Sequence, residues 1–301
     1  MTVLVADIGG TNARFALSPA PGRITRARTT PTSAHENFPA ALEDYLRAVG
    51  RPRLKAAAVA AAGPATPEGI RLTNLDWVVR PIEVARLCDV EDVAMMNDLE
   101  AVAAALPRLK PGDTASLGPA RQAPKRAVRL AVNIGTGFGA GAAIPLHEES
   151  WFPVATEAGH MAFAAASEEE AALLGAAATV EDLLSGAGVA RAHAALTGTG
   201  EGRSAADILS RTRTDPQAKH TATLLARLAG RVTGDLVLAH AAWGGVGLTG
   251  SVAEALIAAA GHRPFLEAFA AKGPMTERMR AVPVARITRA DPALYGLSHC
   301  F

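Results

Sequence analysis

Hydrophobic residues recur along the chain in short runs bounded by glycine, and these runs have two different spacings. Alternating or continuous runs of Val, Ile, Leu and Ala predict β-strands. The predicted strands cover residues 2–10, 13–18, 54–63, 92–98, 127–139, 140–145, 244–251 and 282–287. Apolar residues three and four positions apart predict amphipathic or buried helices. The predicted helices cover residues 36–50, 100–109, 168–178, 180–186, 187–196 and 221–243. Interleaved strands and helices indicate an α/β protein whose sheets are covered by helices.

The stretch from residue 106 to residue 128 interrupts this pattern, because it concentrates Pro, Gly and basic residues and lacks periodicity. It is therefore predicted to be a linker. A chain of 301 residues, of which 49% are apolar, is long enough for two domains. A boundary near the start of this stretch predicts a small N-terminal α/β domain over residues 1–107 and a large α/β domain over residues 108–287.

Each predicted domain opens with a strand that ends in a Gly/Thr turn and is followed by a second strand. Residues 5–17 read VADIGGTNARFAL, and residues 133–139 read NIGTGFG. This repetition predicts a duplicated architecture in which the two turns face each other across a cleft. Ordinary hairpin turns remain the alternative for either turn taken alone.

Charge and composition narrow the range of partners. Thirty basic and 29 acidic residues give a net charge of +1, with no block of like charge. Binding to nucleic acid or to a membrane surface is therefore not expected, and small molecules are the expected partners. Cys88 and Cys300 lie far apart, which fits isolated thiols in a reducing compartment. No secretory signal and no membrane-spanning run is visible, so a cytoplasmic location is expected.

The two glycine turns suit phosphate, because backbone N–H groups in such turns can approach its oxygens and hydroxyl groups add donors. No Walker A loop is present. A dinucleotide fingerprint can be placed on Gly137, Gly139 and Ala142 with Glu157 as its acidic residue, but a strand rather than a helix follows these glycines. Asp7 stands at the mouth of the first turn, where it would repel a phosphate unless a cation lay between them. This pairing predicts a nucleotide with Mg²⁺.

A predicted strand ends at Asn97 and Asp98, and a predicted helix follows almost at once. Asp98 can be an N-cap, a position that favours Asp. It can also be a general base that takes the proton from an attacking hydroxyl in phosphoryl transfer, with Asn97 holding a neighbouring hydroxyl. The sequence leaves both interpretations open.

Glu157 and His160 stand three residues apart in a glycine-containing segment. A di-iron site needs a second Glu-x-x-His unit and a zinc protease needs His-Glu-x-x-His, and both are absent. A solvated loop is one alternative, and recognition of a polyol is the other, because a carboxylate and a neutral imidazole together accept from and donate to vicinal hydroxyls. Glu181 begins the predicted helix over 180–186, where it can be a third acceptor or simply complement the helix dipole.

Six segments, in this order along the chain, resemble those of the bacterial glucokinases in the hexokinase branch of the actin-like ATPase superfamily. They are VADIGGTNARFAL (5–17), AAAGPATPEGIRLTNLDWVV (60–79), MMNDLEAVA (95–103), NIGTGFG (133–139), EAGHMAF (157–163) and VEDLLSGAG (180–188). The resemblance implies two ribonuclease-H-like domains that close on glucose, with residues 288–301 returning to the first domain. It also implies an ATP-dependent hexose kinase that makes glucose 6-phosphate, and a homodimer is expected.

The resemblance further implies a role for each matching residue. Asp98 is the implied base for the 6-hydroxyl of the sugar. The implied sugar-binding residues are Asn97, Asp98, Glu157, His160 and Glu181. The implied nucleotide-binding residues are Asp7, Gly9, Gly10, Thr11, Asn12, Gly135, Thr136, Gly137 and Gly250, with Asp7 acting on Mg²⁺ through water.

Three features depart from the family pattern. Thr249 and Ser251 flank Gly250 where the family has a Gly-Gly turn beside the adenine, and the ending DPALYGLSHCF is shorter than the usual C-terminal helix. No Cys-rich zinc segment follows His160, which favours the zinc-free group of these kinases.

Two alternatives keep the same fold. One is a kinase for another hexose or an amino sugar, and the other is a sugar-sensing protein without turnover. Asp7 and Asp98 together favour an enzyme, because a sensor needs neither the metal nor the base. Trp77 is predicted to pack in the core or at a hinge rather than to stack on a sugar.

Overall fold

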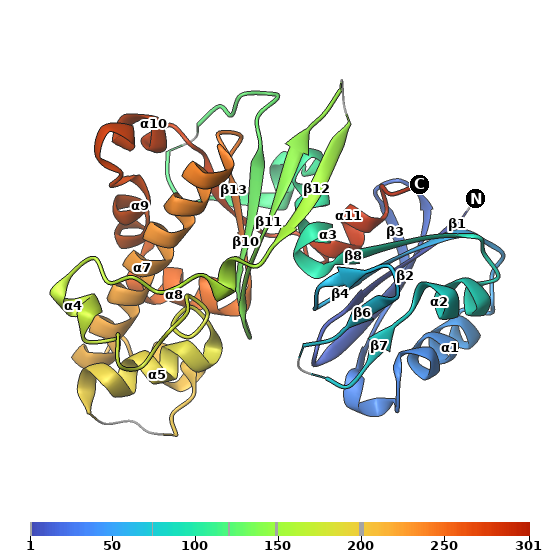
Figure 1. The fold of residues 1–301 in the computed structure, drawn as a ribbon, viewed down its shortest axis with the longest axis horizontal. Helices are drawn as coiled ribbons and strands as arrows, with labels where there is room; N and C mark the ends of the chain where they lie inside the picture. The colour runs from blue at the N-terminus through green and yellow to red at the C-terminus, as the bar shows by residue number, and fades with distance from the viewer. Residues whose placement is uncertain (1, 74, 120, 148–149, 199–201) are drawn as a thin grey trace. The chain divides into compact units, whose positions relative to one another are not determined.

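The computed structural model describes residues 2–301 except 74, 120, 148–149 and 199–201 (Figure 1). Asn74, part of the second resembling segment, thus lies outside the described residues. The chain forms two compact units, each built from strands and helices. The first comprises Met1–Leu109, Trp151–Ala155 and Arg289–Phe301, and the second comprises Lys110–Ser150 and Thr156–Thr288.

The first unit is built on a five-stranded sheet in the order β3-β2-β1-β4-β8. Its strands are β1 (Thr2–Ile8), β2 (Asn12–Ala20), β3 (Arg23–Pro31), β4 (Leu54–Ala61) and β8 (Asp92–Asn97). The first three are antiparallel neighbours, while β4 runs parallel to both β1 and β8. A small second sheet contains β5 (Ala65–Thr66), β6 (Gly69–Arg71) and β7 (Val78–Val79).

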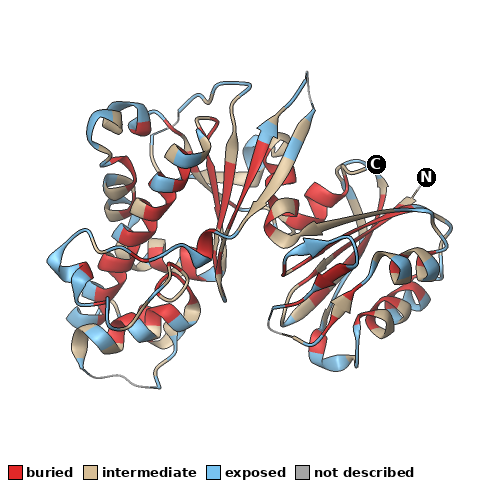
Figure 2. Cartoon of the chain, viewed as in Figure 1, coloured by how far each residue is buried: buried red, intermediate tan, exposed pale blue. Residues whose placement is uncertain are grey.

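Helices contact both faces of this five-stranded sheet. They are α1 (Phe38–Ala48), α2 (Pro81–Cys88), α3 (Asp98–Ala105) and α11 (Pro292–Leu297), with the short 3-10 turns η1 (Thr32–Ala34) and η2 (Leu106–Arg108). Leu4 and Ile8 of β1 share a buried cluster with Phe38 of α1. Val3 and Val5 are also buried and point to the opposite face, because side chains alternate along a strand. Figure 2 shows this strand buried along most of its length.

Trp77 belongs to the same buried cluster and is only 3% exposed, so the prediction that it packs in the core is confirmed. It precedes β7 and lies among the apolar side chains of the first unit. A stacking platform for a sugar would need an exposed ring face, which this burial does not provide.

The second unit repeats the arrangement of the first. Its sheet has the order β12-β11-β10-β13-β14-β9. The strands are β9 (Thr114–Ser116), β10 (Arg129–Ile134), β11 (Phe138–Pro145), β13 (Val246–Thr249), β14 (Val284–Ile287) and the edge strand β12 (Trp151–Thr156), of which Trp151–Ala155 are grouped with the first unit. The β10–β11 hairpin is antiparallel, and β10, β13 and β14 are parallel, as are β1, β4 and β8 of the first unit. The duplicated α/β architecture predicted from the two turns is therefore confirmed within each unit.

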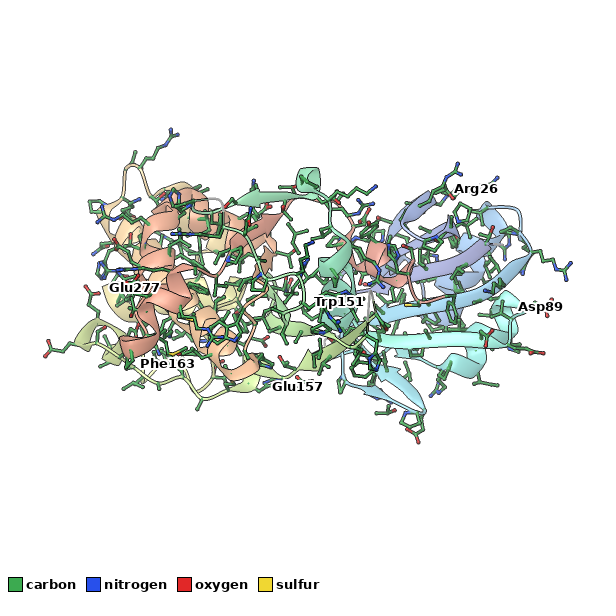
Figure 3. The ribbon with its side chains drawn as sticks, turned by 90° about the horizontal axis from the view of Figure 1, so that it is seen from above. Arg26, Asp89, Trp151, Glu157, Phe163 and Glu277 are labelled. Atoms are coloured by element: carbon green, nitrogen blue, oxygen red, sulfur yellow. The ribbon has the colours of Figure 1, made fainter. Side chains whose placement is uncertain are left out.

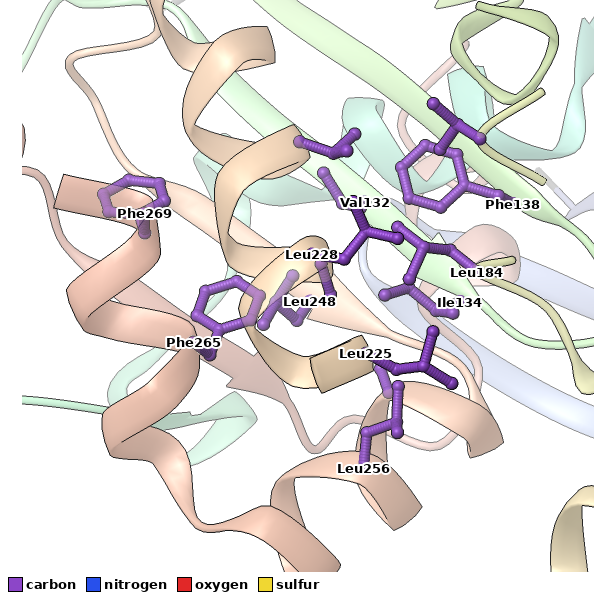
Figure 4. Close-up of a cluster of buried hydrophobic side chains, with 14 of the residues drawn as sticks. Val132, Ile134, Phe138, Leu184, Leu225, Leu228, Leu248, Leu256, Phe265 and Phe269 are labelled. Atoms are coloured by element: carbon purple, nitrogen blue, oxygen red, sulfur yellow. The ribbon is translucent and has the colours of Figure 1, made fainter. Parts of the chain in front are cut away.

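The core of the second unit lies between its sheet and a set of helices. They are α4 (Glu168–Ala171), α5 (Gly186–Thr197), α6 (Ala205–Ser210), α7 (Pro216–His240), α8 (Ser251–Ala260), α9 (His262–Ala270) and α10 (Thr276–Arg280). The 3-10 turns are η3 (Pro111–Asp113), η4 (Ala158–His160) and η5 (Gly273–Met275). Val132 and Ile134 of β10 cluster with Leu228 of α7, and Phe265 stacks on Phe269 in α9 with 6.3 Å between ring centroids (Figure 4).

Three sequence predictions about this unit are wrong in whole or in part. The helix predicted over 168–178 is helical only as α4, and turns follow it. The helix predicted over 180–186 is a turn, because the Asp182 carboxylate accepts the N–H groups of Ala178 and Thr179 and closes the chain there. The next helix begins only at Gly186, where Ser185 caps it by accepting the N–H of Gly188. The predicted linker 106–128 includes β9, which pairs with β14 and so belongs to the sheet.

Several elements went unpredicted. Strand β3 is mostly exposed and polar, so it has no clear hydrophobic period, and α2 is only eight residues long. Within the described residues, none of the helices combines the length and the apolar character required to cross a membrane.

The C-terminal segment of the first unit contains a buried ring nitrogen, Nε2 of His299. His299 packs edge-on against Tyr295, and its Nε2 has no hydrogen-bond partner. Burial, assisted by Arg108 and Arg289, lowers the pKa of His299 from 6.5 to about 4. In the unfolded chain His299 takes up a proton near pH 6.5, whereas in the folded chain it does so only near pH 4. The free energy of unfolding therefore falls as the pH drops from 6.5 to about 4.

His299→Gln should lose less thermal stability between pH 7 and pH 5 than the wild type, because glutamine does not titrate there. Thermal unfolding at both pH values measures this. His262→Gln, at the exposed start of α9, is the control and should keep the wild-type pH slope. An unchanged slope in His299→Gln would contradict the assignment.

Candidate active-site residues

The turn between β1 and β2 presents unused N–H groups. The N–H of Gly9 donates to the carbonyl of Asn12 at 2.9 Å and closes the hairpin. The carbonyls of Gly10 and Thr11 accept from Thr32 at 2.9 Å and 3.0 Å. Within the described part of the chain, the N–H groups of Gly10 and Thr11 have no hydrogen-bond acceptor. A turn with its carbonyls occupied and its donors free is suited to an anion such as phosphate.

Asp7 lies on β1 one residue before the strand ends, directly opposite Arg14 of β2. Its Oδ2 is 2.9 Å from Nη1 of Arg14, and its side chain is only 14% exposed. The guanidinium also faces a second carboxylate, because Nε lies 3.9 Å from Oδ1 of Asp291. Burial raises the pKa of Asp7, Arg14 partly offsets this rise, and Asp291 adds to it. The sequence analysis did not single out Arg14 or Asp291.

The donors around this turn fit Mg²⁺ in one specific way. Across the described ranges, no three His, Cys, Asp or Glu side chains lie together as a metal-binding group. An all-protein cage is thus not formed by these residues. Mg²⁺ commonly uses one or two carboxylates, waters and substrate phosphates. Asp7 fits that pattern, and because Arg14 already holds one of its oxygens, contact through water suits it better than direct ligation.

Asn97 and Asp98 lie at the same edge of the sheet as the first turn. Ile8, Ala61 and Asn97 form one row across β1, β4 and β8. Two strand spacings, about 10 Å, therefore separate the ends of β1 and β8. The carboxyl ends of parallel strands are the edge at which open α/β sheets bind ligands.

Local hydrogen bonds separate the roles of the two residues. Asn97 is the N-cap of α3, since its Oδ1 accepts the N–H of Leu99 at 2.9 Å. The backbone N–H of Asn97 in turn donates to Oε2 of Glu100 at 3.2 Å. Its Nδ2 donates to the carbonyl of Gly63 at 3.1 Å. Asp98 is the first residue of the helix, half-buried, with Oδ1 accepting from Leu99 at 2.9 Å. Because Asn97 caps α3, the helix does not require Asp98 as its N-cap.

The turn between β10 and β11 has the same donor pattern as the first turn. The N–H of Gly135 donates to the carbonyl of Gly137, and the N–H of Gly186 donates to the carbonyl of Gly135, both at 2.9 Å. Thr136 is exposed at the tip. Among the residues that the structure describes, nothing accepts the N–H groups of Thr136 and Gly137.

Glu181 connects this turn to the Glu157–His160 segment. Its Oε2 accepts the N–H of Phe138 at 2.8 Å, and its own N–H donates to the carbonyl of Gly159 at 3.0 Å. A Cβ on Gly137 would lie 2.5 Å from the same Oε2. The structure therefore places Glu181 beneath the turn, in a loop and not at the head of a helix.

Glu157 and His160 are open to solvent, with side chains 65% and 68% exposed (Glu157 is labelled in Figure 3). Oε2 of Glu157 lies 3.9 Å from Nε2 of His160. The η4 turn holds this spacing through a 3.0 Å hydrogen bond from the N–H of His160 to the carbonyl of Glu157. Both side chains can thus meet a ligand while their backbone stays fixed beside Gly159.

Gly250 is required by both its conformation and its surroundings. Its φ is +98°, and a Cβ would lie 2.3 Å from the carbonyl oxygen of Ile134 and 2.6 Å from Oδ1 of Asn133. It precedes α8, whose N-terminus thereby reaches the end of β10. The positive end of a helix dipole at such a turn favours an anion. The sequence analysis did not identify Asn133.

Gly137→Ala tests the position of Glu181. The added methyl group meets Oε2 of Glu181 at 2.5 Å, so the carboxylate must swing away from Phe138. On the sugar-binding role that the family resemblance implies for Glu181, glucose binding measured by calorimetry should weaken roughly tenfold, because an acceptor moves out of place. Gly112→Ala, where nothing lies within 4 Å, is the matched control and should bind glucose like the wild type. Equal affinities for both variants would contradict this placement.

Comparison with known proteins agrees with the geometry. The sequence profile of the family described as Glucokinase matches residues 4–301. A glucokinase of Chromobacterium violaceum is 34% identical, with 98% of this chain and 88% of that protein aligned. A glucokinase of Caulobacter vibrioides is 33% identical, with coverage of 97% and 93%. The crystal structure of a glucokinase from an Antarctic psychrotroph superposes with a TM-score of 0.87 at 30% identity, covering 99% of this chain and 98% of that one.

The fold of these relatives is the actin-like ATPase fold, with the same α/β units described above. The match runs over nearly the full length and includes every candidate residue from Asp7 to Gly250. The chain therefore belongs to the glucokinase family.

Proposed function

We propose that this protein transfers the γ-phosphoryl group of ATP to the 6-hydroxyl of D-glucose, giving glucose 6-phosphate and ADP. One observation carries the proposal: Ile8, Ala61 and Asn97 share a row across three parallel strands. That row brings the free N–H groups of the first turn and the carboxylate of Asp98 to one edge of one sheet. Family membership supports glucose as the acceptor.

Asp98 acts as the general base in this proposal. It lies in the first turn of α3, where Asn97 and Glu100 already satisfy the helix terminus. Its carboxylate takes the proton from the 6-hydroxyl as that oxygen attacks the phosphorus atom. Such a base contributes about 10²–10⁴-fold to a rate, because the attacking alcohol is otherwise protonated at neutral pH.

Asn97, Glu157, His160 and Glu181 hold the other hydroxyls of the sugar. The exposed pair Glu157 and His160 offers a carboxylate acceptor and an imidazole that donates at one nitrogen and accepts at the other. Glu181 adds an acceptor fixed by its bond to Phe138. Fixed acceptors orient the ring, so that the 6-hydroxyl and not a neighbour reaches the phosphoryl group.

Nine residues bind the nucleotide in this proposal. They are Asp7, Gly9, Gly10, Thr11, Asn12, Gly135, Thr136, Gly137 and Gly250. The free N–H groups of Gly10, Thr11, Thr136 and Gly137 donate to phosphate oxygens. Asp7 would hold Mg²⁺ through water, together with the nucleotide phosphates, and the ion would supply positive charge beside the transferring group.

The proposal keeps a two-domain organisation, with residues 1–107 and 288–301 in one domain and residues 108–287 in the other. We also propose a homodimer and a cytoplasmic location from the family resemblance. Light scattering of the purified chain measures the first, and fractionation of the source cells measures the second.

A substrate panel separates this function from its alternatives. ADP release coupled to NADH oxidation should occur with glucose and Mg-ATP, and kcat/KM should be highest for glucose among glucose, mannose, fructose and glucosamine. A higher value for another sugar would make the chain a kinase for that sugar. Glucose binding without ADP release would make it a sensor.

Asp98→Asn should reduce kcat by about 10²–10⁴-fold, because the amide cannot accept the proton. Glucose binding, measured by calorimetry, should stay within about threefold of the wild type, since the amide keeps the shape and one acceptor oxygen. Asp92→Asn is the control: Asp92 is exposed at the start of β8, the strand that precedes Asp98, and its variant should turn over normally. Wild-type kcat in Asp98→Asn would remove Asp98 from the role of base.

A further inference from the structure

Thr32 is a buried polar residue that contacts the first glycine turn twice. It begins the η1 turn directly after β3, and only 4% of its surface is exposed. Its N–H donates to the carbonyl of Thr11 at 3.0 Å. Its Oγ1 donates to the carbonyl of Gly10 at 2.9 Å. One side chain and its own backbone thus occupy two successive carbonyls of the turn.

The local sequence explains why this residue reaches the turn. Strand β3 pairs with β2 up to Pro31, which stands opposite Asn12. The N–H groups of alternate residues along an antiparallel strand point to the neighbouring strand, and here the residue after Pro31 is the one whose N–H points to the first turn. That residue is Thr32, whose hydroxyl extends the contact one carbonyl further, to Gly10. The donors of the β3 end therefore reach the tip of a neighbouring hairpin.

Because the peptide unit is planar, the hydrogen bonds that Thr32 makes to the carbonyls also fix the N–H groups on the other side of the same peptides. In a planar trans peptide the C=O of one residue points opposite to the N–H of the next, and the described chain has no cis peptide bond. Holding the carbonyl of Gly10 therefore fixes the direction of the N–H of Thr11. Holding the carbonyl of Thr11 fixes the N–H of Asn12 in the same way.

We infer that Thr32 is a positioning residue for the nucleotide phosphates, since it aims the N–H groups of the first turn without touching the phosphate itself. The inference rests on the proposed function for the identity of the ligand. Preorganised donors bind an anion better than mobile ones, because no free energy is spent on ordering them when the ligand arrives. Thr32 should consequently act on the nucleotide and not on the sugar.

Thr32→Val removes the hydroxyl and keeps the shape of the side chain. It should raise KM for Mg-ATP about tenfold, the effect of losing a hydrogen bond that orders a charged ligand's site. KM for glucose should stay within about twofold. Thr32→Ser restores the hydroxyl and should restore KM for Mg-ATP. Thr32→Ala replaces the valine variant if that variant does not fold.

Thr25→Val is the matched control. Thr25 lies on the same strand, β3, and its Oγ1 donates to the carbonyl of Leu17 at 3.0 Å, away from the turn. Its variant loses a bond of the same kind, from a threonine hydroxyl to a main-chain carbonyl of the first unit, and should lower Tm to a similar extent as Thr32→Val. Its KM for Mg-ATP should match the wild type.

Calorimetric binding of a non-hydrolysable ATP analogue gives a second readout that does not depend on turnover. Weaker binding in Thr32→Val, with wild-type binding in Thr32→Ser and Thr25→Val, supports the inference. Wild-type affinity in Thr32→Val, or equal rises in KM for both substrates, overturns it. Failure of the proposed function would appear differently, as a wild-type protein that binds the analogue but releases no ADP with glucose.

Discussion

The structure depends on how two hairpin turns satisfy their carbonyl groups. In each unit the carbonyls of a glycine-containing turn accept hydrogen bonds from within the fold, from Thr32 in the first unit and from Gly186 and Gly135 in the second. The N–H of Phe138 donates to Glu181, whereas the N–H groups of Thr11 and Thr136, which share peptide units with the bonded carbonyls of Gly10 and Gly135, have no acceptor among the described residues. Such donors must be satisfied by water or by a ligand. Both turns are thus built to receive an acceptor-rich anion, and the same solution occurs in both copies of the duplicated fold.

Charge near these turns is arranged to control that anion. Asp7 is buried close to the first turn, where its negative charge would oppose a triphosphate, and Arg14 and Asp291 form a line of alternating charges with it. Burial raises the pKa of Asp7, and the charge and hydrogen bond of Arg14 oppose this rise. A cation that binds with the nucleotide would, like Arg14, favour the ionised form of Asp7. The charges around Asp7 and the N–H groups without acceptors in the turns therefore indicate the same ligand, a nucleotide accompanied by Mg²⁺.

The sequence predicts most of the strands and helices and names the candidate site residues. The elements and residues that it does not predict have physical causes. Strands β1, β4, β10 and β13 are mostly buried and therefore appear as continuous apolar runs. Strand β3 is polar because it lies at a sheet edge, so its pattern was invisible. Glu181 was placed on a helix because its neighbours are helix formers, whereas the Asp182 carboxylate closes a turn there. Arg14, Thr32 and Asn133 act through partners distant in sequence, which spacing alone does not reveal.

A crystal structure with glucose and a non-hydrolysable ATP analogue tests the central claim most directly. The account predicts one oxygen of Asp98 within hydrogen-bonding distance of the glucose 6-hydroxyl, with the N–H groups of Gly10 and Thr11 directed at phosphate oxygens. A bound sugar whose 6-hydroxyl lies away from Asp98, or a triphosphate that contacts neither glycine turn, would contradict it.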